Sequence, residues 1–185
     1  MEKTAPLDPA LRSQTLVLVG MMGAGKSSVG KRLAQALDLP FRDADEEIER
    51  AAGCSINEIF ETRGEAEFRE GERRVIARLL DEPPHVLATG GGAFINPQTR
   101  ALIECKAVSV WLKADPEVLA RRVGRKDTRP LLQGKPTLEV LTDLLAAREP
   151  AYRHADLIVE SAEGPHRATV DTIIAALRAR LEGAA

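Results

Sequence analysis

The stretch Gly20-Met21-Met22-Gly23-Ala24-Gly25-Lys26-Ser27 fits the phosphate-loop pattern GxxxxGK[ST] at every fixed position. Its glycines let backbone N–H groups approach a phosphate without a Cβ in the way. Lys26 can bring a positive charge to the β and γ phosphates, and the Ser27 hydroxyl can ligate Mg²⁺. The pattern therefore predicts a nucleoside triphosphate site. The alternative is a glycine-rich turn that binds nothing.

The residues around this loop supply the structural context that the motif requires. Thr15–Val19 is a short apolar run rich in β-forming residues, which predicts a strand before the loop. Val29, Leu33 and Leu37 follow the loop at helical spacing and predict a helix over Ser27–Leu37. A strand, a loop and a helix in this order favour a phosphate site over an unoccupied turn.

Short apolar runs and helical patterns alternate along the rest of the chain. The alternation predicts an α/β fold with a parallel sheet that helices cover on both faces, in three layers. Ser55-Ile56-Asn57-Glu58 is a capping-box pattern that opens a further short helix. The other expected strands are Phe41–Asp43, Val86–Thr89, Val108–Leu112 and Leu157–Val159; the other expected helices are Asp45–Ala52, Glu65–Leu80, Pro97–Ile103, Pro116–Val123, Leu138–Arg148 and His166–Leu181.

Length and composition predict one domain without membrane or nucleic-acid partners. The chain has 185 residues and a formal charge of −2, so no basic surface for nucleic acid is expected. We expect a flexible N-terminal lead-in over residues 1–13 and a single domain over 14–185. Cys54 and Cys105 match no metal or CxxC spacing and read as free thiols. The absence of a signal-peptide pattern or a long apolar run leads us to expect a cytoplasmic protein.

Two carboxylates stand at the end of the second expected strand. Either Asp43 or Asp45 can help to hold Mg²⁺ through water near the phosphate loop. The other can accept the proton of a substrate hydroxyl, or orient that hydroxyl. The alternative for Asp45 is a cap on the helix that begins at Glu46.

Two arginines could serve as forks for an anion, although each has a plainer interpretation. Arg69 and Glu72 have the i, i+3 spacing of a helix-surface ion pair, which these residues taken alone favour. Arg148 stands two residues before Pro150, and a solvated helix end is the favoured interpretation for it. If they point inward, both guanidinium groups can bind a carboxylate in two-point fashion.

Two loops complete the candidate site. Gly90-Gly91-Gly92 follows the third expected strand, and three glycines indicate close approach, unusual dihedral angles or a plain flexible turn. Gly124–Pro136 is long, basic and flanked by glycine, as expected of a lid that closes over a charged ligand or of a solvated surface loop.

The ordered set of motifs resembles the shikimate kinases over roughly residues 15 to 160. The resemblance implies a P-loop kinase fold with a five-stranded parallel sheet and a lid at about 124–136. It also implies Mg²⁺-dependent transfer of the ATP γ-phosphoryl group to the 3-hydroxyl of shikimate, a step of aromatic amino-acid biosynthesis. The matching segments are Gly20–Ser28, Phe41–Asp45, Ile59-Phe60, Phe68–Glu72, Gly90–Gly92, Arg129–Leu132 and Arg148–Tyr152.

The resemblance assigns roles to residues position by position, with shikimate and ATP as the ligands of a monomer. Lys26, Asp45 and Arg129 resemble the catalytic residues, with Arg129 on the transferring phosphate. Ser27 and Asp43 resemble the Mg²⁺ site, Asp43 acting through water. The expected ATP contacts are Gly23, Ala24, Gly25, Lys26, Ser27, Ser28, Arg122 and Arg129; the expected substrate contacts are Asp45, Arg69, Gly90, Gly91, Gly92 and Arg148.

The chain departs from the family pattern in two places. Its lead-in before Thr15 is longer than usual, and Ala162–Arg167 offers no clear equivalent of the family's adenine contact, so that contact stays open.

Three other functions compete with the shikimate kinase interpretation. A GTPase would need DxxG and NKxD motifs, and neither occurs in the chain. A kinase for gluconate or a nucleotide would have no evident use for Arg69 and Arg148 together beside Gly90–Gly92. A non-catalytic ATP-binding module would keep Lys26 but could lose Asp45 or Arg129, and both are present.

Overall fold

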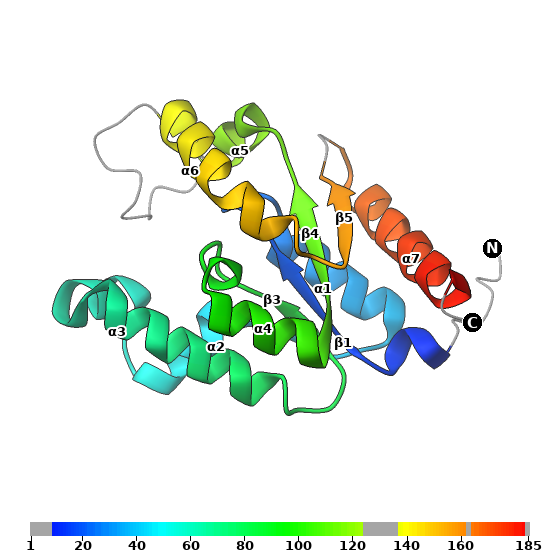
Figure 1. The fold of residues 1–185 in the computed structure, drawn as a ribbon, viewed down its shortest axis with the longest axis horizontal. Helices are drawn as coiled ribbons and strands as arrows, with labels where there is room; N and C mark the ends of the chain where they lie inside the picture. Colours follow the sequence, from blue (N-terminus) through cyan, green and yellow to red (C-terminus); the bar gives the residue numbers. More distant parts are fainter. Residues whose placement is uncertain (1–8, 124–136, 162–163, 184–185) are drawn as a thin grey trace.

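The computed structural model describes residues 9–123, 137–161 and 164–183. Its centre is a five-stranded parallel sheet in the order β2-β3-β1-β4-β5, as drawn in Figure 1. The α/β architecture and the parallel sheet expected from the sequence are confirmed. The strands are β1 (Thr15–Val19), β2 (Phe41–Asp43), β3 (Val86–Ala88), β4 (Ala107–Lys113) and β5 (Leu157–Glu160).

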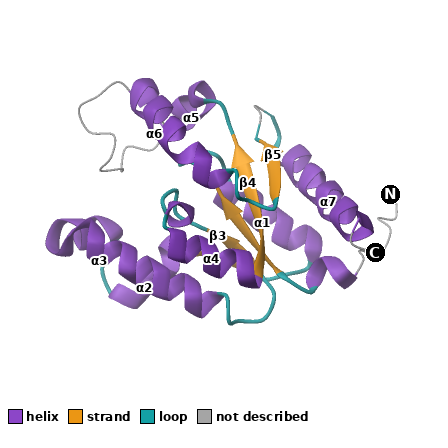
Figure 2. Cartoon of the chain, viewed as in Figure 1, coloured by secondary structure: helices purple, strands orange, loops and turns teal. Residues whose placement is uncertain are grey.

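Helices follow the strands and cover both faces of the sheet (Figure 2). α1 packs on α7, whereas α3 packs on both α2 and α4. The described helices are α1 (Lys26–Leu37), α2 (Ala44–Ala52), α3 (Ile56–Leu79), α4 (Pro97–Lys106), α5 (Pro116–Val123), α6 (Thr137–Tyr152) and α7 (His166–Gly183), with short 3₁₀ helices η1 (Pro9–Arg12) and η2 (Ala93–Ile95).

The central strand β1 is buried along its whole length. It pairs with β3 through Leu18 opposite Ala88, and with β4 through Leu18 opposite Val110. A strand covered by helices on both faces can be apolar throughout, which explains the continuous run at Thr15–Val19. Because the strands are parallel, their carboxyl ends meet at one edge, where the loops after β1, β2 and β3 come together.

α3 joins two segments that the sequence predicts as separate helices. The capping box is present: Glu58 N donates to Ser55 Oγ at 3.2 Å, and Ser55 N donates to Glu58 Oε2 at 2.8 Å. The chain then turns at Gly64, whose φ of 81° and ψ of 172° are not helical. The result is a kinked helix with a long straight part after Gly64.

α6 extends one turn beyond the expected end at Arg148. Pro150 lies inside the last turn of the helix, where its missing N–H deprives only one carbonyl of a helical partner. Tyr152, at the end of this turn, is fully buried and holds the turn against the domain.

Part of the expected lead-in belongs to the fold. Pro9–Arg12 forms η1, which contacts α7, and Leu11 is 4% exposed within the core. Residues 1–8 of the lead-in, and the lid expected at 124–136, lie outside the described residues. In the part of the chain that the structure describes, no helix combines the length and apolar character needed to cross a membrane.

Gly30 sets the distance between α1 and the sheet. A Cβ at this position would lie 2.6 Å from Phe41 Cε2 and 3.2 Å from Leu18 Cδ1. The helix that follows the phosphate loop therefore packs closely on β1 and β2 because residue 30 has no side chain.

We predict that Gly30→Ala lowers the free energy of unfolding by about 1–3 kcal/mol because the added methyl group overpacks this contact. Gly71→Ala is the matched control: it also replaces a helical glycine, but its Cβ would meet nothing within 4 Å. The control should be stabilised by about 0.5–1 kcal/mol through helix propensity. Equal urea midpoints for the two variants would contradict the role of Gly30.

Candidate active site

The phosphate loop takes a conformation that glycine adopts readily and other residues rarely do. Gly20 has φ 131° and Gly25 has φ 92°, and a Cβ on Gly20 would lie 2.7 Å from the carbonyl oxygen of Leu112. α1 begins at Lys26, directly after the loop, and no side chain caps it. Its first N–H groups and the positive end of its dipole therefore form an anion site.

Lys26 lies over this loop. Its Nζ donates to the carbonyl oxygens of Gly20 at 2.8 Å and Met21 at 2.9 Å. The ammonium group is thereby held at the mouth of the loop, where it can meet the phosphates that the loop binds.

Ser27 and Asp43 bring two oxygen donors together beside the loop. Ser27 Oγ donates to Asp43 Oδ2 at 2.7 Å. A hydroxyl and a carboxylate are hard oxygen ligands, and Mg²⁺ in kinases takes few protein ligands and keeps waters and phosphate oxygens as the rest. The donor set therefore fits Mg²⁺.

Asp43, rather than Asp45, caps α2. Asp45 N donates to Asp43 Oδ1 at 3.1 Å, and the helix begins at Ala44. The interpretation of Asp45 as the cap of this helix is therefore wrong. Asp45 instead lines the cavity next to the phosphate loop, with its Oδ1 3.0 Å from the position of a Cβ on Gly90.

Lack of space for a side chain explains glycine at positions 90 and 92, and none of the three consecutive glycines has a positive φ. A Cβ on Gly90 would lie 2.9 Å from Glu72 Oε1, and a Cβ on Gly92 would lie 2.5 Å from Arg69 Nη2. At Gly91 the corresponding distance to Arg148 Nη1 is 3.4 Å. We call these three residues the glycine corner, because charged side chains from α2, α3 and α6 converge on it.

Arg69 and Glu72 form a buried pair, so the interpretation as a helix-surface pair is wrong. Arg69 Nη1 lies 2.7 Å from Glu72 Oε2, and the two side chains are 23% and 2% exposed. Burial raises the pKa of Glu72, and the positive charge of Arg69 opposes this rise. Within the described residues, Glu72 Oε1 has no hydrogen-bond partner. Glu72 is thus a site residue to which the sequence analysis gave no role.

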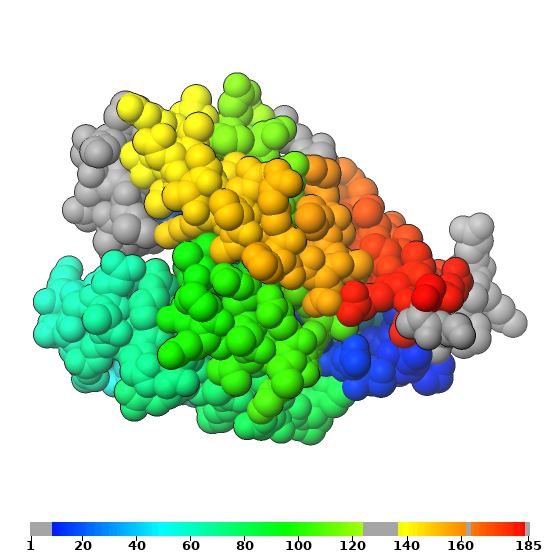
Figure 3. Space-filling model, viewed as in Figure 1, coloured from blue at the N-terminus to red at the C-terminus, as the bar shows by residue number. Residues whose placement is uncertain are grey.

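Arg148 points to the glycine corner, so it is not a solvated helix end. Its Nη1 donates to the carbonyl oxygen of Gly91 at 3.4 Å. Tyr152, one turn further along α6, donates through its hydroxyl to the same oxygen at 2.5 Å. In Figure 3 the orange end of α6 packs directly on the green segment that contains η2, in agreement with the contacts between these elements.

The other end of the site is formed by Arg122 and His166. Arg122 Nη1 donates to Gly23 O and to Ser161 Oγ, both at 3.3 Å, so this side chain lies along the phosphate loop. His166 lies at the start of α7, and its Cε1 atom is 3.4 Å from the position that a Cβ on Gly25 would take. Burial lowers the pKa of His166, and the charges of Arg32 and Arg122 add to this effect. No role for His166 follows from the sequence.

The phosphate loop and the side chains of Asp43, Asp45, Arg122 and His166 line one cavity of about 570 Å³. It extends from His166 and Arg122 past the phosphate loop to Asp45 and Gly91. Arg69, Gly92 and Arg148 do not line this cavity; the two arginines approach Gly92 and Gly91 at the glycine corner. Arg129 lies outside the described residues. The described residues that line the cavity are Gly23, Gly25, Lys26, Ser27, Ser28, Asp43, Asp45, Thr89, Gly90, Gly91, Arg121, Arg122, Val123, Gly164 and His166.

The parallel sheet, the phosphate loop and the carboxylates that face it define a kinase of the P-loop class. A family model described as "Shikimate kinase" matches residues 22–178. A shikimate kinase from Caulobacter vibrioides (strain NA1000 / CB15N) is 67% identical over 168 residues, which cover 91% of this chain and 84% of that protein. The chain belongs to the shikimate kinase family, whose members are ATP-dependent enzymes.

Solved structures agree with this assignment. The structure of a shikimate kinase from Acinetobacter baumannii in complex with shikimate superimposes with a TM-score of 0.88 at 37% identity, covering 93% of this chain and 97% of the other. A gluconokinase from Sinorhizobium meliloti 1021 has a TM-score of 0.63 at 23% identity, covering 92% and 94% of the two chains. The second likeness shows the fold alone.

Tyr152 provides a direct test of the packing behind the glycine corner. Burial raises its pKa to about 12, and the positive charge of Arg148 opposes the rise. Tyr152 is the one tyrosine of the chain, so the tyrosinate absorbance reports this residue alone. The stabilisation that depends on its protonated hydroxyl is therefore complete below pH about 10 and is lost as the pH rises through about 12.

We predict an absorbance midpoint of about 12 in the folded protein and about 10 in denaturant. Tyr152→Phe removes the signal and the bond to Gly91, and should lower the free energy of unfolding by about 1 kcal/mol near neutral pH. The difference in free energy of unfolding between Tyr152→Phe and the unaltered protein should narrow between pH about 10 and about 12. A midpoint near 10 in protein that circular dichroism shows to be folded would contradict the buried hydrogen bond.

Proposed function

We propose that this protein transfers the γ-phosphoryl group of ATP to the 3-hydroxyl of shikimate and so makes shikimate 3-phosphate for aromatic amino-acid biosynthesis. The observation that carries the proposal is the convergence of Asp45, Arg69 and Arg148 on the glycine corner beside the phosphate loop. Membership of the shikimate kinase family and the likeness to a solved structure with bound shikimate support it.

Shikimate is a small anion with three hydroxyl groups, and the residues at the glycine corner match this chemistry. The guanidinium groups of Arg69 and Arg148 are planar forks that can bind a carboxylate through two parallel hydrogen bonds. Asp45 offers a carboxylate, and the backbone N–H of Gly91 a donor, to the hydroxyl groups. Gly90 and Gly92 contribute space, because a Cβ at either position would occupy the place of Asp45, Glu72 or Arg69.

Phosphoryl transfer depends on positioning and on neutralising charge more than on covalent chemistry of the protein. In our proposal the N–H groups from Gly23 to Ser28 and the ammonium group of Lys26 bind the phosphates. Ser27, and Asp43 through water, hold Mg²⁺, which neutralises phosphate charge when bound. Asp45 accepts the proton of the attacking hydroxyl or orients it. Arg129 meets the transferring phosphoryl group, and Arg122 lies near adenine.

Gluconate is the closest rival acceptor, because a gluconokinase shares the fold. Gluconate also carries a carboxylate and hydroxyl groups, so membership of the shikimate kinase family, rather than the two arginines alone, favours shikimate. We further propose that the enzyme acts as a monomer in the cytoplasm.

A coupled assay with ATP, Mg²⁺ and shikimate tests the function, with gluconate and nucleoside monophosphates as alternative acceptors. We predict turnover that depends on shikimate and is absent with the other acceptors. Lys26→Ala should abolish turnover and leave thermal unfolding nearly unchanged, because Lys26 contributes charge rather than packing. Turnover with gluconate but not with shikimate would overturn the proposal.

Arg69→Lys and Arg148→Lys test the two forks. Each variant keeps the positive charge and loses the paired geometry of guanidinium. Shikimate binding should weaken by about 1.5–3 kcal/mol in either variant, the range for loss of a charge-assisted hydrogen bond. ATP binding should change little, because the phosphate loop is intact. Calorimetry that found weaker ATP binding and unchanged shikimate binding would show the assignment to be wrong.

A further inference from the structure

Asp45 and Arg69 are presented by α2 and α3, which pack on each other, and α2 has few large apolar side chains to bury. α2 has nine residues, and its buried members are Ala44, Glu47 and Ile48. Ile48 is the one large apolar side chain among these three. A helix of this length is not stable by itself, so its position depends on what it packs against. One of its buried side chains, Glu47, is a carboxylic acid.

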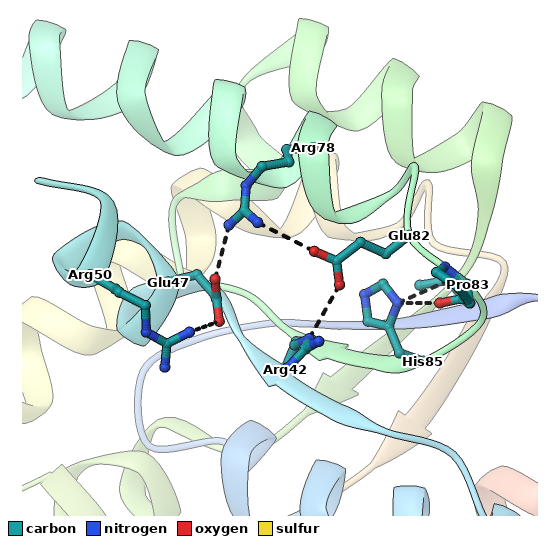
Figure 4. Close-up of polar contacts among 8 residues, drawn as sticks. Arg42, Glu47, Arg50, Arg78, Glu82, Pro83 and His85 are labelled. Carbon is teal, nitrogen blue, oxygen red and sulfur yellow. Dashed lines mark hydrogen bonds and ion pairs between the residues drawn. The ribbon is translucent and has the colours of Figure 1, made fainter.

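Glu47 lies between two arginines, as Figure 4 shows. Its carboxylate oxygen Oε2 accepts a hydrogen bond from Arg78 Nη2 of α3 at 2.9 Å, and Oε1 accepts one from Arg50 of α2. The side chain of Glu47 is 10% exposed, whereas that of Arg78 is 53% exposed. The Glu47–Arg78 pair thus joins α2 to α3, with the carboxylate of Glu47 buried and the guanidinium group of Arg78 near solvent.

The bridge continues to a third element. Arg78 Nη1 lies 3.3 Å from Glu82 Oε1, and Arg42 Nε of β2 lies 3.3 Å from Glu82 Oε2. Figure 4 shows the side chains meeting from α2, α3 and β2. We call Arg50, Glu47, Arg78, Glu82 and Arg42 the ion chain. It connects three of the segments that carry proposed site residues, α2, α3 and β2.

Each segment holds a proposed site residue close to its member of the ion chain. Glu47 follows Asp45 by two residues in the same helix, and Arg42 immediately precedes Asp43. Arg78 and Arg69 are both in the straight part of α3 after Gly64, nine residues apart. At about 1.5 Å per residue this is about 13 Å of rigid helix. A shift of Arg78 against Glu47 therefore moves Arg69 relative to Asp45.

We propose that Glu47 is a positioning residue, which through Arg78 fixes α2 against α3 and so sets the spacing between Asp45 and Arg69. The inference rests on the proposed function, because it concerns the binding of shikimate. A buried ion pair adds little net stability compared with apolar packing, but its directional hydrogen bonds allow one arrangement of the two helices. Arg63 and Glu67, also in α3, form a pair that is 50% and 56% exposed, and this pair joins no other helix to α3.

The charge of Glu47 is maintained well below neutral pH. The hydrogen bond from Arg78 lowers its pKa most, Arg50 contributes to the same effect, and burial opposes it. A lowered pKa means that the stabilisation is complete above the ordinary value of 4.5 and is lost as the pH falls below it. Of the other charged groups in the ion chain, Glu82 faces Arg78, and Arg42 faces Glu82. The bridge is therefore intact at the pH of the assay.

The test compares Glu47→Gln and Arg78→Gln with the unaltered enzyme in steady-state kinetics. Each variant should raise the KM for shikimate on the order of tenfold, since small misplacements of binding groups have large effects. The KM for ATP should stay within about twofold, because the phosphate loop is not part of the bridge. Arg78 is half exposed, and Arg50 still pairs with Glu47 when Arg78 is replaced, so we expect Arg78→Gln to fold, which circular dichroism checks.

Arg180→Gln is the matched control. Arg180 Nη2 lies 2.8 Å from Asp156 Oδ1, and the two side chains are 47% and 23% exposed, similar to the Arg78–Glu47 pair. This pair also joins segments far apart in the chain, but it connects α7 to the loop before β5. Its loss should lower thermal stability and leave the KM for shikimate unchanged, which separates a positioning effect from a general loss of stability.

The double variant Glu47→Gln/Arg78→Gln decides whether the two residues act through each other. Its KM for shikimate should equal that of the more affected single variant, because the bridge is lost only once. If the increase in KM for shikimate in the double variant equals the product of the two single increases, the inference is wrong. It is also wrong if both single variants keep an unchanged KM for shikimate while the unaltered enzyme shows normal turnover. Unaltered enzyme without shikimate-dependent turnover would instead overturn the proposed function, and this inference with it.

Discussion

The site depends on a lack of space at the glycine corner. Three consecutive residues after β3 have no side chain; Asp45, Glu72 and Arg69 crowd the places of the Cβ atoms of Gly90 and Gly92, and Arg148 contacts Gly91. These charged groups come from the neighbouring helices α2 and α3 and from α6, which lies far from both along the chain. Because protein interiors are closely packed, a methyl group added at Gly90 or Gly92 would displace at least one of them. The backbone of the glycine corner thus determines how closely these groups can approach.

The two ends of the site differ in where their charge comes from. At the phosphate loop, backbone N–H groups and the start of α1 supply partial positive charge without a buried ion. At the glycine corner the charges are on side chains, and burial raises the pKa of Glu72 while Arg69 stabilises its ionised form. Tyr152 and Arg148 satisfy the carbonyl oxygen of Gly91 from behind. The acceptor side therefore needs support from a wider set of residues, including the ion chain between α2 and α3.

Much of this arrangement was accessible from sequence patterns. The phosphate loop, the five strands and the capping box at Ser55 were found where expected. Interpretations that considered only residues close in the sequence were wrong where burial determined the position of a side chain. Arg69 and Glu72 have the spacing of a surface pair, yet Glu72 is 2% exposed because α3 turns this side chain toward the glycine corner. Asp45 precedes a run of acidic helix residues, yet Asp43 provides the cap because the helix starts one residue earlier than expected.

The sequence by itself determined the elements whose geometry is local: the glycine-rich loop, the buried central strand and the helix that follows it. It also determined the family, because the motifs occur in a specific order. Only the tertiary structure decided which charged residues meet. Glu47 and Arg78 are 31 residues apart, and Tyr152 and Gly91 are 61 apart. No periodic pattern encodes such pairs, because they arise when separately formed elements pack and bury one side chain against another.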